Sequence, residues 1–159
     1  MIVNWRSLMN LREKIYKILT RNDTGETKSH QSGITIPRNV ALTGVFPKMG
    51  VESLNPRTSV TFYDENDALW TFQYIYYNDI YFGKPRNKAH NEYRLTCVKD
   101  FIAKYKARSG DEIWFGIDDN GVRRIGIERK SYEQSTNITR DSSGVTVIKL
   151  GQNWRSIKI

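Results

Sequence analysis

Two polar stretches of the sequence carry side chains that could recognise the edges of nucleic-acid bases. Residues 21–31 contain no aliphatic side chain, and residues 78–94 combine basic side chains and amides with tyrosines. In the major groove, guanine presents two acceptors that are best met by Arg or Lys, whereas cytosine presents an amino donor that requires a carboxylate. Both kinds of side chain occur in both stretches, which predicts the reading of G·C pairs.

The acidic residues in these stretches indicate the reading of bases and not only the neutralisation of phosphates. A domain that only neutralises phosphates gains nothing from Asp23 and Glu92, because a carboxylate repels the nucleic-acid backbone. A domain that reads G·C pairs needs such residues. Two simpler interpretations stay open: residues 21–31 are also compatible with a long surface loop, and residues 78–94 with a solvated charged face.

The composition favours a polyanionic partner. The 159 residues include 25 Lys and Arg against 17 Asp and Glu, a formal charge of +8. This balance favours nucleic acid or an anionic membrane surface. No apolar run of about 18 residues is present, so we expect no membrane span and a soluble, intracellular protein. One cysteine, Cys97, and two histidines, His30 and His90, are too few for an internal disulfide or the usual zinc site.

The pattern of apolar residues predicts one mostly β domain over residues 1–159, with about seven strands and short flanking helices. An amphipathic helix is expected over Trp5–Leu19, within an N-terminal helical segment 1–20, and a short second helix behind Thr96, ending near Gly110. Turn residues at 64–67 and 118–121 predict two hairpins. Strands are expected at 34–36, around 60–62, and at 69–77, 92–96, 113–117, 122–127 and 145–150.

A series of short motifs in one order resembles the N-terminal effector-binding domain of EcoRII-type restriction endonucleases. The motifs span roughly Arg21 to Thr96 and are Asn22–Gly25, Thr27, His30-Gln31, Gly33, Ile36-Pro37, Phe46-Pro47, Leu54–Pro56, Tyr76–Asn78, Phe82–Lys84, Arg86-Asn87, Glu92 and Arg94. Residues 109–115 are similar to the Gly-Asp turn and following strand of plant B3 transcription-factor domains. The resemblance implies a B3-like pseudobarrel that grips duplex DNA with an N-arm, residues 21–31, and a C-arm, residues 78–94, in the major groove.

The same resemblance implies what the domain does not do. In the EcoRII family this domain reads a CC(A/T)GG-type site and cuts nothing, and a separate C-terminal domain is the nuclease. We therefore expect a non-enzymatic, cofactor-free and monomeric DNA-binding domain of a type II restriction endonuclease, whose nuclease domain is absent from this chain. Its expected location is the bacterial cytoplasm, in association with DNA.

The resemblance and the chemistry of base edges together indicate the candidate DNA-binding residues. Lys84, Arg86 and Arg94 are candidates for guanine, and Asp23 and Glu92 for cytosine amino groups. The remaining candidates, for other base edges or phosphates, are Arg21, Asn22, Thr24, Lys28, His30, Gln31, Asn78, Asn87, Lys88 and Asn91. The sequence departs from the family at residues 88–91, which are an insertion, and at Tyr93, where a basic residue is expected.

Two alternatives assign the chemistry elsewhere. Residues 125–130 end in Glu128 and Lys130, which with the upstream Asp118 and Asp119 is half of a Mg²⁺-dependent PD-(D/E)xK nuclease pattern. The pattern is short, and both aspartates fall in a predicted turn, so a charged strand end is the simpler interpretation. A barrel that binds single strands is the other alternative, and its stacking platforms would be Trp70, Tyr74, Tyr76 and Tyr81.

Overall fold

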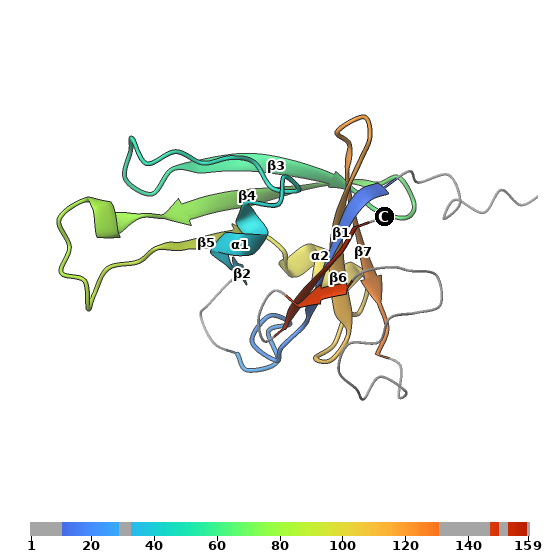
Figure 1. The fold of residues 1–159 in the computed structure, drawn as a ribbon. Helices are drawn as coiled ribbons and strands as arrows, with labels where there is room; N and C mark the ends of the chain where they lie inside the picture. The colour runs from blue at the N-terminus through green and yellow to red at the C-terminus, as the bar shows by residue number, and fades with distance from the viewer. Residues whose placement is uncertain (1–10, 29–32, 131–146, 150–152, 159) are drawn as a thin grey trace, which may run out of the picture.

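The fold is a single curled sheet whose strands are mostly antiparallel. The computed structural model describes residues 11–28, 33–130, 147–149 and 153–158. The strand order is β2-β5-β4-β3-β7-β6-β1-β9-β8, and the link between β3 and β7 is parallel, with Tyr63 beside Arg124 (Figure 1). The strands are β1 (Leu11–Ile18), β2 (Ile34–Ile36), β3 (Arg57–Tyr63), β4 (Leu69–Tyr77), β5 (Glu92–Thr96), β6 (Glu112–Asp118), β7 (Arg123–Glu128), β8 (Val147–Lys149) and β9 (Trp154–Lys158).

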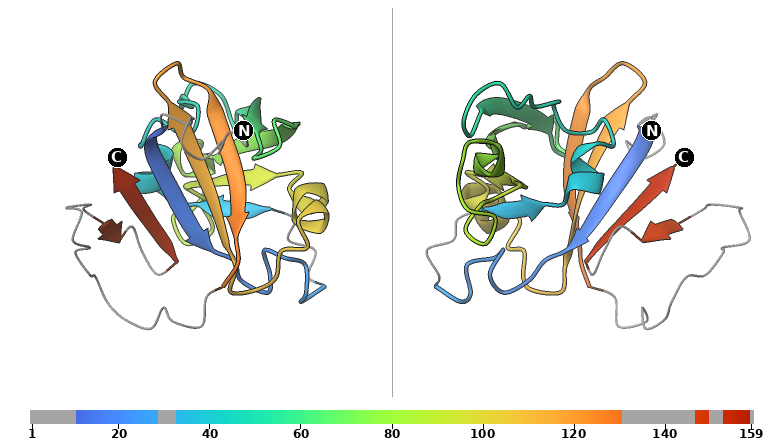
Figure 2. Two further views of the ribbon diagram at one scale, coloured as in Figure 1. Left: turned by 90° about the vertical axis from the view of Figure 1, so that its right-hand side faces the viewer. Right: turned by 60° about the vertical axis from the view of Figure 1, so that its left-hand side comes forward.

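Aromatic rings from both halves of the curled sheet meet in one core. Phe46 lies 6.1 Å from Phe62 on β3, 5.3 Å from Tyr74 on β4 and 5.2 Å from Phe115 on β6, measured between ring centroids. Figure 2 shows β7, β6, β1 and β9 side by side, with the half of the sheet that contains β2, β5 and β4 on the other side of this interior. The expected mostly β, barrel-like architecture is confirmed, and the described residues form nine strands where about seven were predicted.

The helices are short. In the described part of the chain they are α1 (Arg38–Ala41), the 3₁₀ turn η2 (Asp79–Tyr81) and α2 (Lys99–Lys104). The second predicted helix is confirmed as α2, although its N-cap is Val98 and not Thr96. No helix of the described residues is long and apolar enough to cross a bilayer.

The predicted N-terminal helix over Trp5–Leu19 is wrong where the structure describes it, because Leu11–Ile18 form β1. This strand lies between β6 and β9, so both of its edges are hydrogen-bonded, and Ile15, Tyr16 and Lys17 are buried in succession. Ile15 packs into the main core, while Tyr16 lies on the other face with Trp114 in a second small cluster. Burial on both faces removes the alternation that identifies a strand, and the resulting pattern is similar to that of a helix. Residues before Leu11 lie outside the described part.

Both predicted hairpin turns are confirmed, and the buried Asp64 organises the first of them. The Asp64 carboxylate accepts hydrogen bonds from the amides of Asn66 (2.8 Å) and Ala68 (2.9 Å), the Trp70 indole (2.8 Å) and the Tyr105 hydroxyl (2.6 Å). Burial by itself raises the pKa of Asp64, but these four donors outweigh it and lower that pKa below its usual range. The turn is thereby fixed to the end of α2.

The remaining strands and helices include some that the sequence predicted and two that it did not. The 69–77 and 92–96 strands have the predicted bounds, and the 145–150 strand is present as the shorter β8. Strand β9 and helix α1 were not predicted, because Trp154–Lys158 and Arg38–Ala41 are short and mix charged with apolar residues.

Replacing Asp64 should destabilise the whole domain. In Asp64→Ala, the Trp70 indole and the Tyr105 hydroxyl lose their acceptor, which should lower the free energy of unfolding by about 2–3 kcal/mol, measured by chemical denaturation. Because the folded carboxyl has a lowered pKa, the contribution is present above its unfolded pKa and is lost as the pH falls through the folded value. The control Glu65→Ala, in the same turn, should change stability by less than about 0.5 kcal/mol. Equal effects of the two substitutions would contradict this account of the turn.

Candidate nucleic-acid interface

The two arms flank one strand pair at the edge of the sheet. The N-arm connects β1 to β2, and the C-arm connects β4 to β5. Strands β2 and β5 are antiparallel, with Ile34 opposite Leu95 and Ile36 opposite Tyr93. The N-arm therefore enters the pair at one end and the C-arm at the other. Figure 1 shows the C-arm extending beyond the ends of β4 and β5, and the N-arm below the sheet.

Gly33, directly before β2, lies close against β5. Its φ is +120°, and a Cβ at this position would lie 2.6 Å from the Leu95 carbonyl oxygen and 3.3 Å from the Arg94 side chain. A larger residue would be strained in backbone conformation and would collide with β5. Gly33 therefore allows the start of β2 to pack closely against β5.

Inside the N-arm, Asp23 serves the local structure. Its carboxylate accepts hydrogen bonds from the Thr20 amide (2.8 Å) and hydroxyl (2.9 Å) and forms an ion pair with Lys17. The side chains of Lys17 and Asp23 are 8% and 7% exposed, so the pair is closed to solvent. The Thr24 hydroxyl donates to the carbonyls of Thr20 and Arg21. Asp23 and Thr24, predicted to contact DNA, thus have partners within the arm.

The outer part of the N-arm is tied to the loop after α2. The exposed Glu26 accepts hydrogen bonds from Thr24 and from the Ser109 amide (3.0 Å), which lower the pKa of this carboxyl. The Thr27 hydroxyl donates to Asn22 Oδ1 (3.1 Å). Arg21 and Lys28 are exposed on the same arm. The predicted His30 and Gln31 lie outside the described residues.

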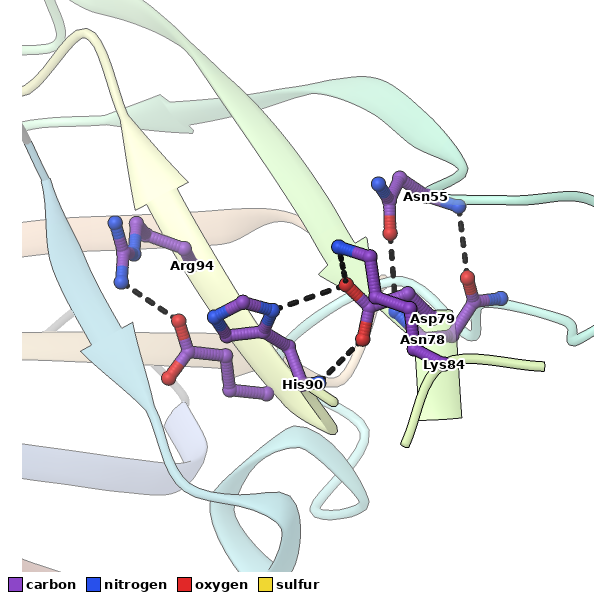
Figure 3. Close-up of polar contacts among 7 residues, drawn as sticks. Asn55, Asn78, Asp79, Lys84, His90 and Arg94 are labelled. Carbon is purple, nitrogen blue, oxygen red and sulfur yellow. Dashed lines mark hydrogen bonds and ion pairs between the residues drawn. The ribbon is translucent and has the colours of Figure 1, made fainter. Parts of the chain in front are cut away.

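At the root of the C-arm, Asn78 is fully buried. Its Oδ1 accepts from the Asn55 amide (2.7 Å), its Nδ2 donates to the Ser53 carbonyl (2.8 Å), and its own amide donates to Asn55 Oδ1 (3.2 Å) (Figure 3). Asn78 was predicted to contact DNA. The structure instead uses all of its side-chain polar atoms to join the C-arm to the loop before β3.

Asp79, which the sequence analysis missed, is the centre of the C-arm. Its carboxylate accepts from Lys84 Nζ (2.8 Å) and the His90 main-chain amide, and Oδ2 lies 3.0 Å from His90 Nδ1 (Figure 3). The Lys84 ammonium, followed by the His90 ring and amide, holds the pKa of Asp79 far below its usual range. No sequence signal marks this residue, because its partners are five and eleven positions away in a loop.

Glu92 and Arg94 lie on β5 between the two arms. Arg94 Nη2 is 2.6 Å from Glu92 Oε1, and the Arg94 guanidinium carbon lies 5.5 Å from the centroid of the Tyr77 ring. The side chains of Arg94 and Glu92 are 20% and 32% exposed, so both reach the surface. The neighbouring Asn91 accepts from the buried Tyr76 hydroxyl (2.6 Å). The structure thus brings the predicted acid and base of β5 side by side.

The tip of the C-arm carries free polar groups. Arg86, Asn87 and Lys88 are exposed, and the described part of the chain offers their side chains no hydrogen bond or ion pair. The Lys88 amide donates to the Pro85 carbonyl (2.8 Å), which closes a turn with Arg86 and Asn87 at its centre. These three side chains are available to an external ligand.

The structure does not bring together the acidic residues of the alternative nuclease site. Asp118 lies at the turn end of β6, where its carboxylate accepts from the Asn120 and Val122 amides, whereas Glu128 pairs with Glu112 at the opposite end of the hairpin. The length of β7, about 17 Å, separates the acidic groups. Among the described residues, no three His, Cys, Asp or Glu side chains are grouped as metal ligands.

Most of the aromatic residues proposed to stack on the bases of a single strand are not exposed. Tyr74 and Tyr76 are 0% and 2% exposed, and Tyr76 stacks on Tyr93 with a centroid distance of 4.1 Å. Trp70 is partly buried against Phe101. Of the four aromatic residues proposed to stack on bases, Tyr81 alone is exposed. The aromatic run therefore serves the core and not base stacking.

A curled antiparallel sheet with two polar arms at the ends of one edge-strand pair defines the B3-like class of pseudobarrel domains. Residues 13–101 match the family described as "Restriction endonuclease EcoRII, N-terminal". The chain belongs to this family.

Curated relatives and a solved structure agree with this class. The chain is 32% identical over 113 residues to Auxin response factor 3 of Oryza sativa and 28% identical over 134 residues to Auxin response factor 3 of Arabidopsis thaliana. These matches cover 71% and 78% of this chain but 14% and 20% of the relatives. The structure titled "Arabidopsis FUS3-DNA complex" has a TM-score of 0.55 and 22% identity, over 73% of this chain and 96% of that chain, which is a likeness of fold.

Removal of the Asp23 carboxylate should cost stability through Lys17. Asp23→Ala leaves a buried ammonium without its partner, which should lower the free energy of unfolding by about 3 kcal/mol. The double variant Lys17→Met/Asp23→Ala should recover a large part of this loss, because no buried charge remains. Denaturation of the unmodified protein, of Asp23→Ala, of Lys17→Met and of the double variant, with the exposed Lys28→Ala as control, measures the difference. Additive losses in the double variant would show that the ion pair does not stabilise the arm.

Proposed function

We propose that this chain is a sequence-specific double-stranded DNA-binding domain that holds the major groove between its N-arm and C-arm. The observation that carries the proposal is the placement of both arms at opposite ends of the β2–β5 pair, with Glu92 and Arg94 between them. The net charge of +8 supports a polyanionic ligand, and the family membership and the DNA complex of the similar FUS3 structure support DNA.

The spacing of the arms suits the groove. The rise of a β-strand places the two ends of β5, Glu92 and Thr96, about 13 Å apart. The major groove of B-DNA is about 12 Å wide. The C-arm enters β5 at one end, and the N-arm enters β2 beside the other end of β5, so the two arms are spaced on the scale of one groove, with the outward side chains Glu92 and Arg94 facing its floor.

The exposed side chains divide into base and phosphate contacts. Arg86, Asn87 and Lys88 are exposed in the turn at the tip of the C-arm and are our candidates for base edges and the adjoining backbone. Arg21 and Lys28, exposed on the N-arm, are candidates for phosphates. Asp23, Asn78 and Asp79 have internal partners and are assigned to holding the arms in shape.

Glu92 and Arg94 together match a G·C pair. In the major groove this base pair presents the guanine acceptors O6 and N7 beside the cytosine amino donor. A guanidinium and a carboxylate held side by side on one strand offer the complementary donor and acceptor. We assign Arg94 to guanine and Glu92 to cytosine.

We also propose which DNA sequence the domain recognises and in which kind of protein it acts. Family membership supports a CC(A/T)GG-type site and a role as the target-binding or effector-binding module of a type II restriction endonuclease, with the nuclease in another domain. We propose further that the protein is bacterial and cytoplasmic and that the isolated domain is monomeric. The plant auxin response factors show that similar segments also occur in much longer proteins of a different kind.

Selection of bound duplexes from a random library should return one short G·C-containing sequence. The selected duplex should bind at least 100-fold more tightly than a scrambled duplex of equal composition, because base contacts add to the electrostatic attraction. Poly-dT serves as the single-strand control and should compete poorly. Recovery of unselected sequences, or better competition by poly-dT, would contradict a duplex reader.

Glu92→Gln should relax specificity at one position. The variant replaces the carboxylate with an amide, which removes the negative charge that favours the cytosine amino group and adds a donor beside the remaining acceptor; this should weaken binding to the selected duplex by about 1–3 kcal/mol and reduce discrimination at that base pair. Glu65→Gln on the distant β3–β4 turn is the matched control and should bind as the unmodified protein does. Fluorescence anisotropy with all four base pairs at each position measures the effect. An equal loss on every sequence would contradict the assignment.

The affinity should also depend steeply on salt. Neutralisation of about six phosphates gives a slope near −5 in a plot of log affinity against log salt concentration. Lys88→Ala should flatten this slope by about one, whereas Lys99→Ala on α2 should leave it unchanged. A slope near zero would rule out the electrostatic part of the proposal.

A further inference from the structure

One buried carboxylate joins the two limbs of the C-arm. Asp79 lies in η2 at the outgoing limb, and its side chain is 5% exposed. It accepts a hydrogen bond from Lys84 at 2.8 Å and contacts both the main-chain amide and, at 3.0 Å, the ring of His90 on the returning limb (Figure 3). The Ile80 amide also donates to the His90 carbonyl (3.3 Å). Residues 79 and 90 are thereby held together as the base of a closed loop.

The same contacts divide the basic residues of the arm into two groups. The Lys84 ammonium is directed to Asp79 and lies between the two limbs. Arg86, Asn87 and Lys88 follow in the turn closed by Pro85 and have no such contact within the described residues. The charges at the tip therefore project from a loop whose base is already fixed.

A fixed base matters because an arm that is disordered in the free protein must be ordered when it binds. Each immobilised side chain and loop residue reduces the affinity, and a loop that is held in its bound shape avoids much of this cost. A structural role in the β core does not explain Asp79, because its partners Lys84 and His90 are arm residues with 55% exposed side chains.

We propose that Asp79 is a positioning residue that holds the C-arm in its DNA-binding shape before DNA binds, and that Lys84 acts through Asp79 and not on a base. This inference rests on the proposed function. It replaces the expected contact between Lys84 and guanine with contacts from the tip of the arm.

The test compares Asp79→Asn with the control Asp119→Asn, an exposed aspartate in the β6–β7 turn. Hydrogen exchange of residues 79–90 in the free protein reports on the shape of the arm without any DNA. Anisotropy on the selected duplex at several salt concentrations reports on binding. Asp79→Asn should exchange faster in the arm alone, bind about 10-fold more weakly or worse, and keep the salt slope, since no phosphate contact is removed. Asp119→Asn should match the unmodified protein.

Lys84→Met and the double variant Asp79→Asn/Lys84→Met test the role of Lys84. If Lys84 acts through Asp79, the double variant should bind no more weakly than Asp79→Asn, because both substitutions remove one interaction. Lys84→Met also keeps the test valid if Asp79→Asn does not fold. Additive losses, or loss of discrimination at a single guanine in Lys84→Met, would overturn the assignment of Lys84.

The outcomes separate this inference from the proposed function. Unchanged exchange of residues 79–90 in Asp79→Asn would overturn the positioning role, while a loss of binding in Arg86→Ala/Lys88→Ala would still support the interface. Normal binding by Arg86→Ala/Lys88→Ala would overturn the proposed interface, whatever Asp79→Asn does to exchange. Faster exchange with normal binding in Asp79→Asn, while the tip variants lose affinity, would show that preordering is not needed.

Discussion

The pairing of β2 with β5 is the constraint on which the candidate interface depends. It places β2, which follows the N-arm, beside Arg94 and Leu95, and the return of the C-arm at Glu92, so the two polar segments are joined to one strand pair although some fifty residues separate them in the chain. The pairing itself requires Gly33, since any Cβ there would collide with the Leu95 carbonyl. The aromatic core behind β4 and β5 then keeps this edge of the sheet rigid.

Polar residues in the arms perform two different tasks. Asp23, Asn78 and Asp79 are buried or nearly so and have all their described partners inside the protein, while Arg86, Asn87 and Lys88 project without internal partners. Buried carboxylates and amides fix loop shapes because each leaves a costly unsatisfied group if its partner moves. A loop rich in polar residues therefore does not present all of them to a ligand, and the exposed minority defines the surface that recognition can use.

Much of the fold could be predicted from the sequence, and the exceptions have physical causes. Strand β4, an aromatic and β-branched run, and strand β5, with alternating burial, were predicted with their observed bounds. Strand β1 was mistaken for a helix because it is central and has buried side chains on both faces. In the candidate site, the motifs located both arms, but no pattern could show that Asn78 points inward or that Asp79 joins Lys84 to His90. Such contacts depend on the path of the loop and not on residue type.

The Glu92–Arg94 ion pair explains why the proposed recognition is selective among base pairs. In the free protein each charge already has a partner at 2.6 Å, so leaving that partner for DNA has a cost. A G·C pair in the correct orientation offers replacements to both groups at once, the guanine acceptors for Arg94 and the cytosine amino group for Glu92. The other base pairs present their donors and acceptors in a different order across the groove, so they do not meet both groups in this arrangement. Discrimination then arises as much from the unmet partner at a wrong site as from the bonds made at the right one.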